Sequence, residues 1–367
     1  MSIAPNLVII SSEQFGHHID TYYYCRYLQP EFSVTYICWD HGLPRLALDN
    51  VNIVYVSRDG GLARIGRFVR VVDQIAAGLD SKSPAVFFIN YMKGMSSLIR
   101  LRHWRQKFVL DIRTGDVSPN QWIRLVKNTL LKVEYSLFNN VSVISESLAA
   151  RLGLSDRAYI LPLGADEIAP GNRSFDVLRV LYVGTLYNRN LATAVKGFAS
   201  FLKHSGVGGL LTIVGGSPGS EKSELNALIR DLHLVGRVTV VGAVPHDQLA
   251  PYFAQHNIGL SYIPITPYYD VQPPTKTFEY LMSGMAVLGT ATLENKKVIS
   301  AENGVISDDT ADGVCAGLQA LASDLGRFSS DEIRNSVGQH RWPIIIENLR
   351  HHLIEIAAGI KAPEQTS

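Results

Sequence analysis

The chain of 367 residues contains only three cysteines, Cys25, Cys38 and Cys315. No two of them stand at a spacing typical of metal ligands, so the sequence supports neither a disulfide framework nor a zinc site. We expect all three to be small buried hydrophobic residues in a reducing compartment. No apolar run approaches the roughly 18–20 residues of a membrane-spanning helix, and the chain does not begin like a signal peptide. These absences predict a cytoplasmic protein, or one that is peripheral on the inner face of the cytoplasmic membrane.

The sequence also has no excess of charge of either sign. Its 34 Lys and Arg residues are balanced by 33 Asp and Glu residues, which gives a net charge of +1 at pH 7. This balance excludes a polycation built for nucleic acid, and we expect no nucleic-acid partner. The charge is unevenly spread, because residues 1–166 carry 18 basic and 14 acidic side chains and the remainder carries 16 and 19. The amino-terminal half therefore has a charge of +4 and the rest a charge of −3.

Apolar residues are plentiful, at 46% of the chain against 18% charged residues. This composition excludes a disordered chain, and the length suits two domains of roughly 150–200 residues. Short apolar runs typical of buried parallel strands cover 6–11, 33–38, 52–56, 85–89, 108–112 and 141–145. A second series of such runs covers 177–184, 210–216, 237–242, 257–263 and 285–290. Stretches with helical periodicity, such as 62–79 and 121–138, separate the runs.

This alternation predicts an α/β protein with two doubly wound, Rossmann-like parallel sheets. We expect an N-terminal domain over 1–165, a linker over 166–176 that contains glycine and proline, and a C-terminal domain over 177–340. Residues 341–367 are expected to form a final amphipathic helix that packs back on the N-terminal domain. Because ligands of such sheets bind beyond the carboxyl ends of the strands, the cleft between the domains is the expected site.

The start of one predicted helix combines a cation with a carboxylate. In the segment PPTKTFEY, which covers 273–280, Thr275 is a candidate helix cap. Lys276 and Glu279 are three residues apart and therefore share a helical face. A helix N-terminus with a lysine suits a phosphate, and a nearby carboxylate can accept hydrogen bonds from sugar hydroxyls. The alternative is an ordinary solvated Lys–Glu pair at a helix start.

The segment FEYLMSGMAVLGT, over 278–290, resembles the donor-site signature of retaining GT-B glycosyltransferases, the large glycosyltransferase family four (glycosyl transferases group 1). Segments 144–166, 178–198 and 211–253 resemble further blocks of that family in the same order. The resemblance extends over about 144–345 and is weak before that. It implies a GT-B fold, in which two Rossmann-like domains face each other across a cleft, and sugar transfer from a nucleotide-sugar donor.

The resemblance also implies roles for individual residues. Glu279 matches the family's glutamate that holds the ribose hydroxyls of the donor, and Lys276 and Arg189 would neutralise the diphosphate. The donor-binding residues that it implies are Gly16, Gly184, Thr185, Arg189, Gly215, Gly216, Val244, Pro245, Val271, Thr275, Lys276 and Glu279. The residues that it implies to be catalytic are Glu279, Lys276, Arg189 and Asp116.

Two positions depart from the family's pattern. The family often has a first glutamate eight residues before the second, where this chain has Val271 between Asp270 and Gln272. It also often has an arginine after the donor-loop glycine, where this chain has Thr185. We therefore expect unusual contacts to the transferred sugar and a diphosphate that depends on Arg189 and Lys276.

The acceptor is expected in the N-terminal domain, at two loops that follow predicted strands. One is FGHHID over 15–20 and the other is DIRTGDVSP over 111–119, with its charged residues on the loop. The expected acceptor-binding residues are His17, His18, Asp111, Arg113 and Asp116. A plain role at a helix start is the favoured alternative for the two histidines. Salt bridges within the loop explain its charged residues equally well.

A basic stretch interleaved with apolar residues lies between 64 and 107. It contains Arg64, Arg67, Phe68, Arg70, Lys93, Arg100, Arg102, Trp104, Arg105 and Lys107. This pattern suits an anionic membrane interface, and it suits an ordinary solvated face equally well. In the first case the acceptor would be a lipid-linked saccharide of bacterial surface polysaccharide or glycolipid biosynthesis.

The sequence thus predicts a retaining, hexosyltransferase-type glycosyltransferase without a cofactor or a metal. Basic side chains and helix dipoles would stabilise the leaving diphosphate. Asp308 and Asp309 are expected to cap a helix near Ala311 rather than to bind a metal. Two alternatives stay open: a GT-B nucleotide-sugar epimerase or hydrolase, and a catalytically degenerate GT-B partner protein of a polysaccharide-assembly complex.

Overall fold

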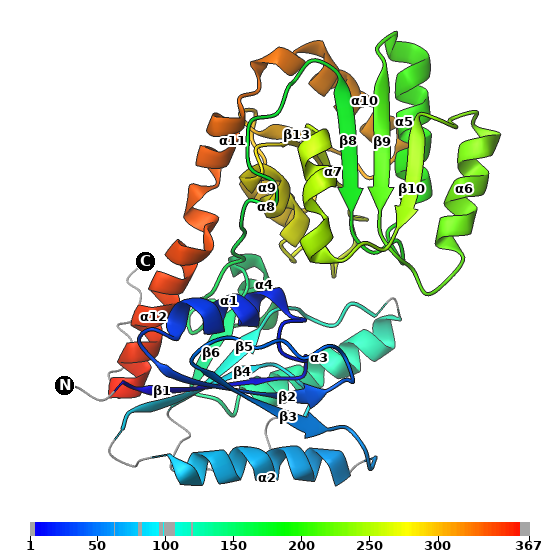
Figure 1. Ribbon diagram of the computed structural model, residues 1–367. Helices are drawn as coiled ribbons and strands as arrows, with labels where there is room; N and C mark the ends of the chain where they lie inside the picture. Colours follow the sequence, from blue (N-terminus) through cyan, green and yellow to red (C-terminus); the bar gives the residue numbers. More distant parts are fainter. Residues whose placement is uncertain are drawn as a thin grey trace. The chain divides into compact units, whose positions relative to one another are not determined.

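The computed structural model describes residues 4–61, 63–79, 83–94, 98, 107–118 and 120–359 (Figure 1). Contacts divide the chain into two compact units. The first unit holds the described residues up to Leu163 together with those from Trp342 onward, and the second holds Gly164–Arg341. The chain therefore passes from one unit to the other twice, after Leu163 and after Arg341.

The first unit is built on a parallel sheet whose described strands have the order β3-β2-β1-β4-β5-β6-β7. These strands are β1 (Asn6–Ser11), β2 (Ser33–Asp40), β3 (Val51–Ser57), β4 (Ala85–Asn90), β5 (Phe108–Ile112), β6 (Asn140–Val143) and β7 (Tyr159–Ile160). The helices described in this unit are α1 (Ile19–Leu28), α2 (Ala63–Gly78), α3 (Gln121–Tyr135), α4 (Glu146–Leu152) and α12 (Trp342–Ala358). Figure 1 shows α1 and α12 on one side of the sheet and α2 on the other.

Helix α12 completes the core of the first unit from the far end of the sequence. Its buried residues include Trp342, Leu349 and Leu353, which belong to the same apolar cluster as residues of α1, β1 and β2. The ring of Trp342 stacks on that of Tyr23, with 4.8 Å between the centroids. Because the apolar residues recur every three or four positions, one face of the helix is covered by the unit.

The second unit is built on a six-stranded parallel sheet with the order β10-β9-β8-β11-β12-β13. Its strands are β8 (Leu178–Val183), β9 (Gly209–Val214), β10 (Val238–Gly242), β11 (Ile258–Ser261), β12 (Ala286–Thr290) and β13 (Gly304–Ser307). Its α-helices are α5 (Leu191–Ser205), α6 (Glu221–Asp231), α7 (Ala250–Gln255), α8 (Thr275–Met282), α9 (Leu293–Val298), α10 (Ala311–Ser323) and α11 (Ser330–Ser336). Short 3-10 helices cover η3 (His246–Gln248), η4 (Leu325–Arg327) and η5 (Gly338–His340).

The predicted fold class, an α/β protein with two Rossmann-like parallel sheets, is confirmed. Every predicted strand is present, and each of its ends lies within two residues of the predicted one. Strands β7 and β13 were not predicted. Strand β7 has only two residues, and the two central residues of β13 are only half-buried.

The segment 166–176, which was expected to be a linker, packs on the second unit. The guanidinium of Arg173 donates to the carbonyl of Ser283 at 3.0 Å, and the backbone N–H of Arg173 donates to Ser330 Oγ at 2.8 Å. The backbone N–H of Ile168 donates to Ser283 Oγ at 3.0 Å. These contacts fix the segment to the ends of α8 and α11.

Two helix starts differ from their predictions. Helix α10 is capped by Thr310, whose side chain accepts from the backbone N–H of Gly313, whereas Asp309 accepts from the backbone N–H of Ile265 at 2.8 Å. The prediction that Asp308 and Asp309 cap this helix was therefore wrong. At α8 the cap position is Pro274, whose extended backbone precedes the helix, so the prediction of Thr275 as the cap was wrong by one residue.

The three cysteines are buried, as the sequence predicted. Cys25, Cys38 and Cys315 are all buried and free. None of the helices in the described ranges is long and apolar enough to cross a membrane.

Candidate functional site

The topology of the second unit places a crevice between β8 and β11. These two strands are neighbours and run parallel. From β8 the chain continues to β9 and β10 on one side of the sheet, and β11 is followed by β12 and β13 on the other. The connections that leave β8 and β11 therefore diverge, which opens the sheet at its carboxyl edge. Parallel sheets of this kind bind ligands at this switch point.

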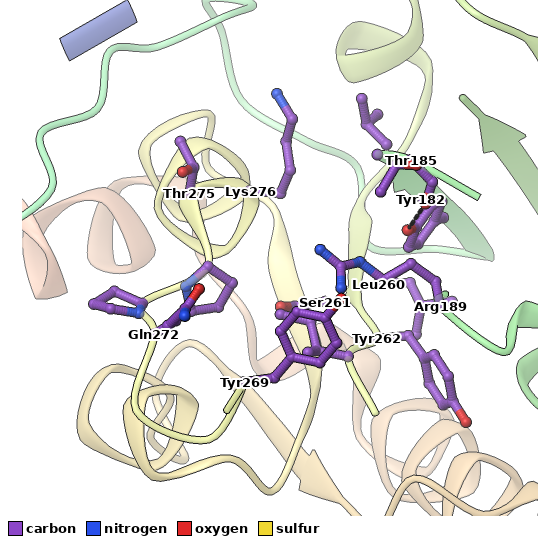
Figure 2. A pocket seen from close by; sticks show the side chains of 15 residues that line it. Tyr182, Thr185, Arg189, Leu260, Ser261, Tyr262, Tyr269, Gln272, Thr275 and Lys276 are labelled. Carbon is purple, nitrogen blue, oxygen red and sulfur yellow. Dashed lines mark hydrogen bonds between the residues drawn. The ribbon is translucent and has the colours of Figure 1, made fainter. Parts of the chain in front are cut away.

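A cavity of about 320 Å³ lies at that switch point (Figure 2). Its walls come from the end of β8 and the loop after it, from the end of β11 and the loop after it, and from the start of α8. The lining residues are Tyr182, Val183, Gly184, Thr185, Arg189, Leu260, Ser261, Tyr262, Ile263, Tyr269, Gln272, Pro273, Pro274, Thr275 and Lys276. All of them belong to the second unit.

The first turn of α8 brings backbone N–H groups and an ammonium to this cavity. Pro273 and Pro274 hold the preceding chain extended, and Pro274 occupies the cap position without a side-chain acceptor. The first N–H groups of the helix therefore have no capping partner from that residue, and the helix N-terminus carries partial positive charge. Lys276, in the same turn, adds a full positive charge beside it.

Glu279 lies one turn further along α8 and is buried. Its Oε2 accepts from Lys276 Nζ, and its Oε1 is 3.5 Å from Nε2 of His246, which begins η3 after β10. Burial alone would raise the pKa of Glu279, but Lys276 and His246 lower it below its usual value. The carboxylate is therefore ionised at neutral pH and is held between two donors.

Arg189 stands in the loop between β8 and α5. It lies between Asn188 and Asn190, which both adopt the left-handed conformation that asparagine tolerates well. Its guanidinium carbon is 4.4 Å from the centroid of the Tyr269 ring, and Figure 2 shows the two side chains together in the cavity wall. The Nη1 atom of Arg189 is buried and has no hydrogen-bond partner. A buried donor without an acceptor is costly, and an anionic ligand would satisfy it.

Gly184 and Gly215 allow the loop after β8 to lie close to the sheet. A Cβ at Gly215 would be 1.8 Å from the carbonyl oxygen of Gly184, so the second position must be glycine for this backbone approach. The backbone N–H of Gly184 donates to the carbonyl of Val214 at 3.0 Å, which ties the loop to β9. Gly215 thus supports the wall of the cavity without lining it, and Gly216 would bring a Cβ within 3.1 Å of Ala243.

The residues around the missing first glutamate have separate roles. Val271 is buried, and Asp270 accepts from the backbone N–H of Leu293, the first residue of α9, at 2.8 Å. Gln272 lines the cavity. Of these three, Gln272 is therefore the one available to a ligand there.

The remaining residues predicted to bind the donor are more dispersed. Thr185 and Thr275 line the cavity. Val244 lines a different hollow, and Pro245 precedes η3 and so positions His246. Gly16 lies in the first unit, where its φ of +84° and the approach of Leu46, within 2.3 Å of an added Cβ, explain the glycine by packing.

Asp111 and Arg113, expected to contact an acceptor, form a buried ionic cluster in the first unit. Arg113 Nη2 is 2.5 Å from Asp20 Oδ2, and Nη1 donates to the carbonyl of Leu161 at 2.6 Å. Asp111 lies within β5, not in the loop as predicted, and Ser142 Oγ donates to it at 2.7 Å. Burial raises the pKa of Asp111 to about 6 although Arg113 and Ser142 lower it. Asp111 has no exposed surface and Arg113 only 8% of its side chain, so the salt-bridge alternative describes both.

The other residues expected at the acceptor lie nearer the surface of the same unit. Asp116 Oδ2 is 2.8 Å from Lys127 Nζ. Burial raises the pKa of Asp116, but Lys127 and the backbone N–H of Ser118 lower it below its usual value. His18 caps α1 by accepting from the backbone N–H of Thr21, the helix-start alternative for this residue. His17 is exposed, with Nε2 3.3 Å from the carbonyl of Pro44.

The structure describes the predicted basic stretch in part. Arg100, Arg102, Trp104 and Arg105 lie outside the described residues. Arg64 and Arg70 are exposed on α2, whereas Arg67 donates to the carbonyls of Ser57 and Asp59. Phe68 is buried in the core.

Sequence reasoning missed His246 and Tyr269. His246 directly follows Val244 and Pro245, which were predicted to bind the donor. Its contact with Glu279 could not be predicted, because the two residues are far apart in the sequence and meet only in the folded unit. Tyr269 stands two residues before the position of the missing glutamate, and nothing in the sequence pairs it with Arg189. Within the described ranges, no three His, Cys, Asp or Glu side chains lie close enough to hold a metal ion.

Known structures share this fold. Sucrose-phosphate synthase from Thermosynechococcus elongatus matches with a TM-score of 0.76 and 18% identity, over 96% of this chain and 100% of that one. A glycosyltransferase from Rickettsia africae matches with a TM-score of 0.73 and 13% identity, over 96% and 99% of the two chains. Anabaena HepE in complex with UDP matches with a TM-score of 0.71 and 13% identity, over 96% and 100%. The chain thus has the fold of GT-B glycosyltransferase structures, while no protein-family model and no curated protein matches its sequence.

Proposed function

We propose that this protein is a glycosyltransferase that uses a nucleotide-sugar donor bound in the cavity between β8 and β11. One observation carries the proposal: two cations and a helix N-terminus supply the walls of a single cavity at the switch point of the sheet. Lys276 and Arg189 both line it, and α8 begins there. This combination suits the diphosphate of a nucleotide sugar, because the cations and the helix end all favour negative charge.

Glu279 would orient the nucleoside part of the donor. Its carboxylate is ionised and buried, and a carboxylate in this state accepts hydrogen bonds from ribose hydroxyls. Lys276 can serve the carboxylate and the diphosphate together, because an ammonium has three N–H donors. The lysine would thereby link the recognition of the ribose to that of the phosphates.

The chemistry that we propose is transfer with retention of the anomeric configuration. The bond between the sugar and the diphosphate breaks, the acceptor oxygen attacks from the same face of the sugar, and the leaving diphosphate receives the acceptor proton. Lys276, Arg189 and the start of α8 would stabilise the charge that develops on the diphosphate. Because these groups supply the positive charge, we expect a chelator to leave the rate unchanged, and proton NMR of the first product to show a retained anomeric configuration.

We propose a lipid-linked saccharide of bacterial surface polysaccharide or glycolipid biosynthesis as the acceptor. The first unit carries the net positive half of the sequence, which supports an anionic surface as its partner. Of the charged residues expected at the acceptor from the β5–α3 loop, Asp116 keeps 18% of its side chain exposed, whereas Asp111 and Arg113 are buried.

Calorimetric titration with UDP, GDP and ADP tests the donor site. UDP comes first, because it is bound in the HepE structure that shares the fold. The chain offers a matched control for Lys276→Ala: Lys297 and Glu294 form the same three-residue pair on α9, with 3.2 Å between the charged atoms, and neither residue lines the cavity. We expect Lys276→Ala to raise the Kd of the preferred nucleotide by roughly tenfold or more, and Lys297→Ala to leave it unchanged.

Other outcomes would favour the alternatives. If the wild type binds none of the three nucleotides, the chain is better described as a degenerate partner protein. If it releases free sugar from a bound nucleotide sugar at the same rate with and without acceptors, it is a hydrolase. Equal binding by Lys276→Ala and the wild type would contradict the assignment of the site.

A further inference from the structure

Helix α3 (Gln121–Tyr135) turns its apolar side chains away from the first unit. Its buried residues are only Leu131 and Tyr135. Its exposed large apolar residues, which we call the outward face of α3, are Trp122, Ile123, Leu125, Val126, Leu130 and Val133. Trp122 is 68% exposed and Val126 59%. Surface helices ordinarily pack such residues against the core, whereas α3 exposes them to solvent.

The outward face forms one arc, which also contains the exposed Thr129. At about 100° per residue, Trp122, Val126 and Val133 lie within roughly 40° of one another. Leu125 and Ile123 mark the two borders of an arc about 160° wide. Leu131, which faces the core, lies opposite its centre. Soluble proteins rarely leave an apolar surface of this kind uncovered unless it has a partner.

Basic residues border the outward face on both sides. Lys132 lies about 20° beyond the border at Leu125, whereas beyond the border at Ile123 Glu134 comes first, at about 20°, and Lys127 follows at about 40°. Lys132 is exposed, and Lys127 reaches Asp116 at 2.8 Å. The single carboxylate of the helix, Glu134, accepts from the backbone N–H of Gly94 at 2.9 Å and so is directed to the protein. An apolar arc with lysines at its borders is typical of helices that lie in a lipid–water interface.

We propose that the outward face of α3 docks the protein on an anionic lipid bilayer. Trp122 would lie at the headgroup level, where tryptophan is favoured, and the aliphatic residues would enter the acyl boundary. The charges favour lipid over a second copy of the chain, because two outward faces packed about a two-fold axis would bring lysine borders together. This surface differs from the predicted basic stretch at 64–107, since it depends on residues 122–133.

Docking through α3 does not depend on donor binding in the second unit. If the proposed function also holds, docking through α3 explains why the acceptor would be lipid-linked. The loop that carries Asp116 leads directly into α3, and Lys127 joins the two. A bilayer at α3 would therefore lie beside the residue expected to contact the acceptor.

Flotation of the full chain with vesicles tests the proposal. We expect the wild type to float at low salt with vesicles of equal parts phosphatidylglycerol and phosphatidylcholine, and less with pure phosphatidylcholine. The double substitution Val126→Glu with Leu130→Glu should lower the partition coefficient by roughly tenfold or more, because it places two charges in the apolar arc. Val235→Glu is the matched control, since this valine is 73% exposed in the second unit, and it should float like the wild type.

Tryptophan fluorescence gives a second readout, and comparison with Trp122→Phe separates the signal of Trp122 from that of the other three tryptophans. Trp342 is buried, whereas Trp122 is exposed and should shift its emission to shorter wavelength when the vesicles bind. Trp122→Phe should keep flotation within a few-fold of the wild type and lose most of that shift. Circular dichroism of each variant verifies that it is folded.

Three outcomes would overturn the proposal. The first is a wild type that does not float on anionic vesicles at low salt, and the second is a folded double variant that floats as well as the wild type. The third is a wild type that sediments as a dimer and a double variant that sediments as a monomer, which would make a second copy the occupant of the outward face.

Discussion

Lys276 and Glu279 form an ion pair across the first turns of α8, with the ammonium in the wall of the cavity and the carboxylate buried behind it. His246 approaches the same carboxylate from η3, at 3.5 Å. A buried carboxylate is stable as an anion only if such partners compensate for its lost hydration. The cation that lines the cavity therefore also keeps the carboxylate charged.

The first prediction concerns the pH dependence of stability at Glu279. Its pKa is lowered in the folded state, so its contribution is complete above the usual range of glutamate and is lost as the pH falls through the lowered value. Urea denaturation should show the wild type losing stability over this acidic window more steeply than Glu279→Gln. Lys276→Met, which removes the main attractive charge, should move the window to higher pH. Parallel curves for the wild type and Glu279→Gln would contradict the prediction.

The second prediction uses two ion pairs of equal length. Arg113–Asp20 and Arg45–Asp40 both measure 2.5 Å, but Arg113 is buried and 62% of the Arg45 side chain is exposed. Arg113→Ala should lower the free energy of unfolding by about 3–5 kcal/mol, because Asp20 is left buried without its partner. Arg45→Ala should change it little, since water solvates both groups. Urea titrations of both variants measure the difference, and equal effects would show that burial does not decide it.

Local patterns allowed the strands and the Lys276–Glu279 pair to be predicted. Alternation of short apolar runs with helical periods is a property of consecutive residues, and positions three apart on a helix share a face whatever surrounds them. His246 and Arg113 could not be assigned in the same way. Asp20 is 93 positions from Arg113, and His246 reaches Glu279 only because β10 and α8 belong to one folded unit.

The sequence of a helix also does not show which of its faces packs on the core. The periodicity of 121–138 correctly predicted a helix there, but it does not say which face packs on the sheet. In the structure the core takes Leu131 and Tyr135 from α3, while Trp122 and Val126 face outward. Asn120 caps the start of this helix, and the ion pair between Asp116 and Lys127 joins the helix to the preceding loop.

The third prediction concerns the close backbone approach at Gly215. Gly215→Ala places a Cβ 1.8 Å from the carbonyl oxygen of Gly184, so the loop that lines the cavity must move. We expect a loss of about 1–3 kcal/mol in the free energy of unfolding and weaker nucleotide binding. Gly326→Ala is the control, because a Cβ there meets nothing within 4 Å. Urea titration and calorimetry measure both effects, and unchanged binding in a folded Gly215→Ala protein would refute the link.

The last prediction concerns the stacking of Arg189 on Tyr269. The ring face holds the guanidinium 4.4 Å from its centroid, which orients the buried Nη1 that has no hydrogen-bond partner. Tyr269→Leu should raise the Kd of the preferred nucleotide by about three- to tenfold, whereas Tyr269→Phe, which keeps the ring face, should bind like the wild type. In an Arg189→Ala background the leucine substitution should add nothing, because the group that it positions is gone. An equal loss in Tyr269→Phe, or a full additional loss in the Arg189→Ala background, would show that the tyrosine acts through another contact.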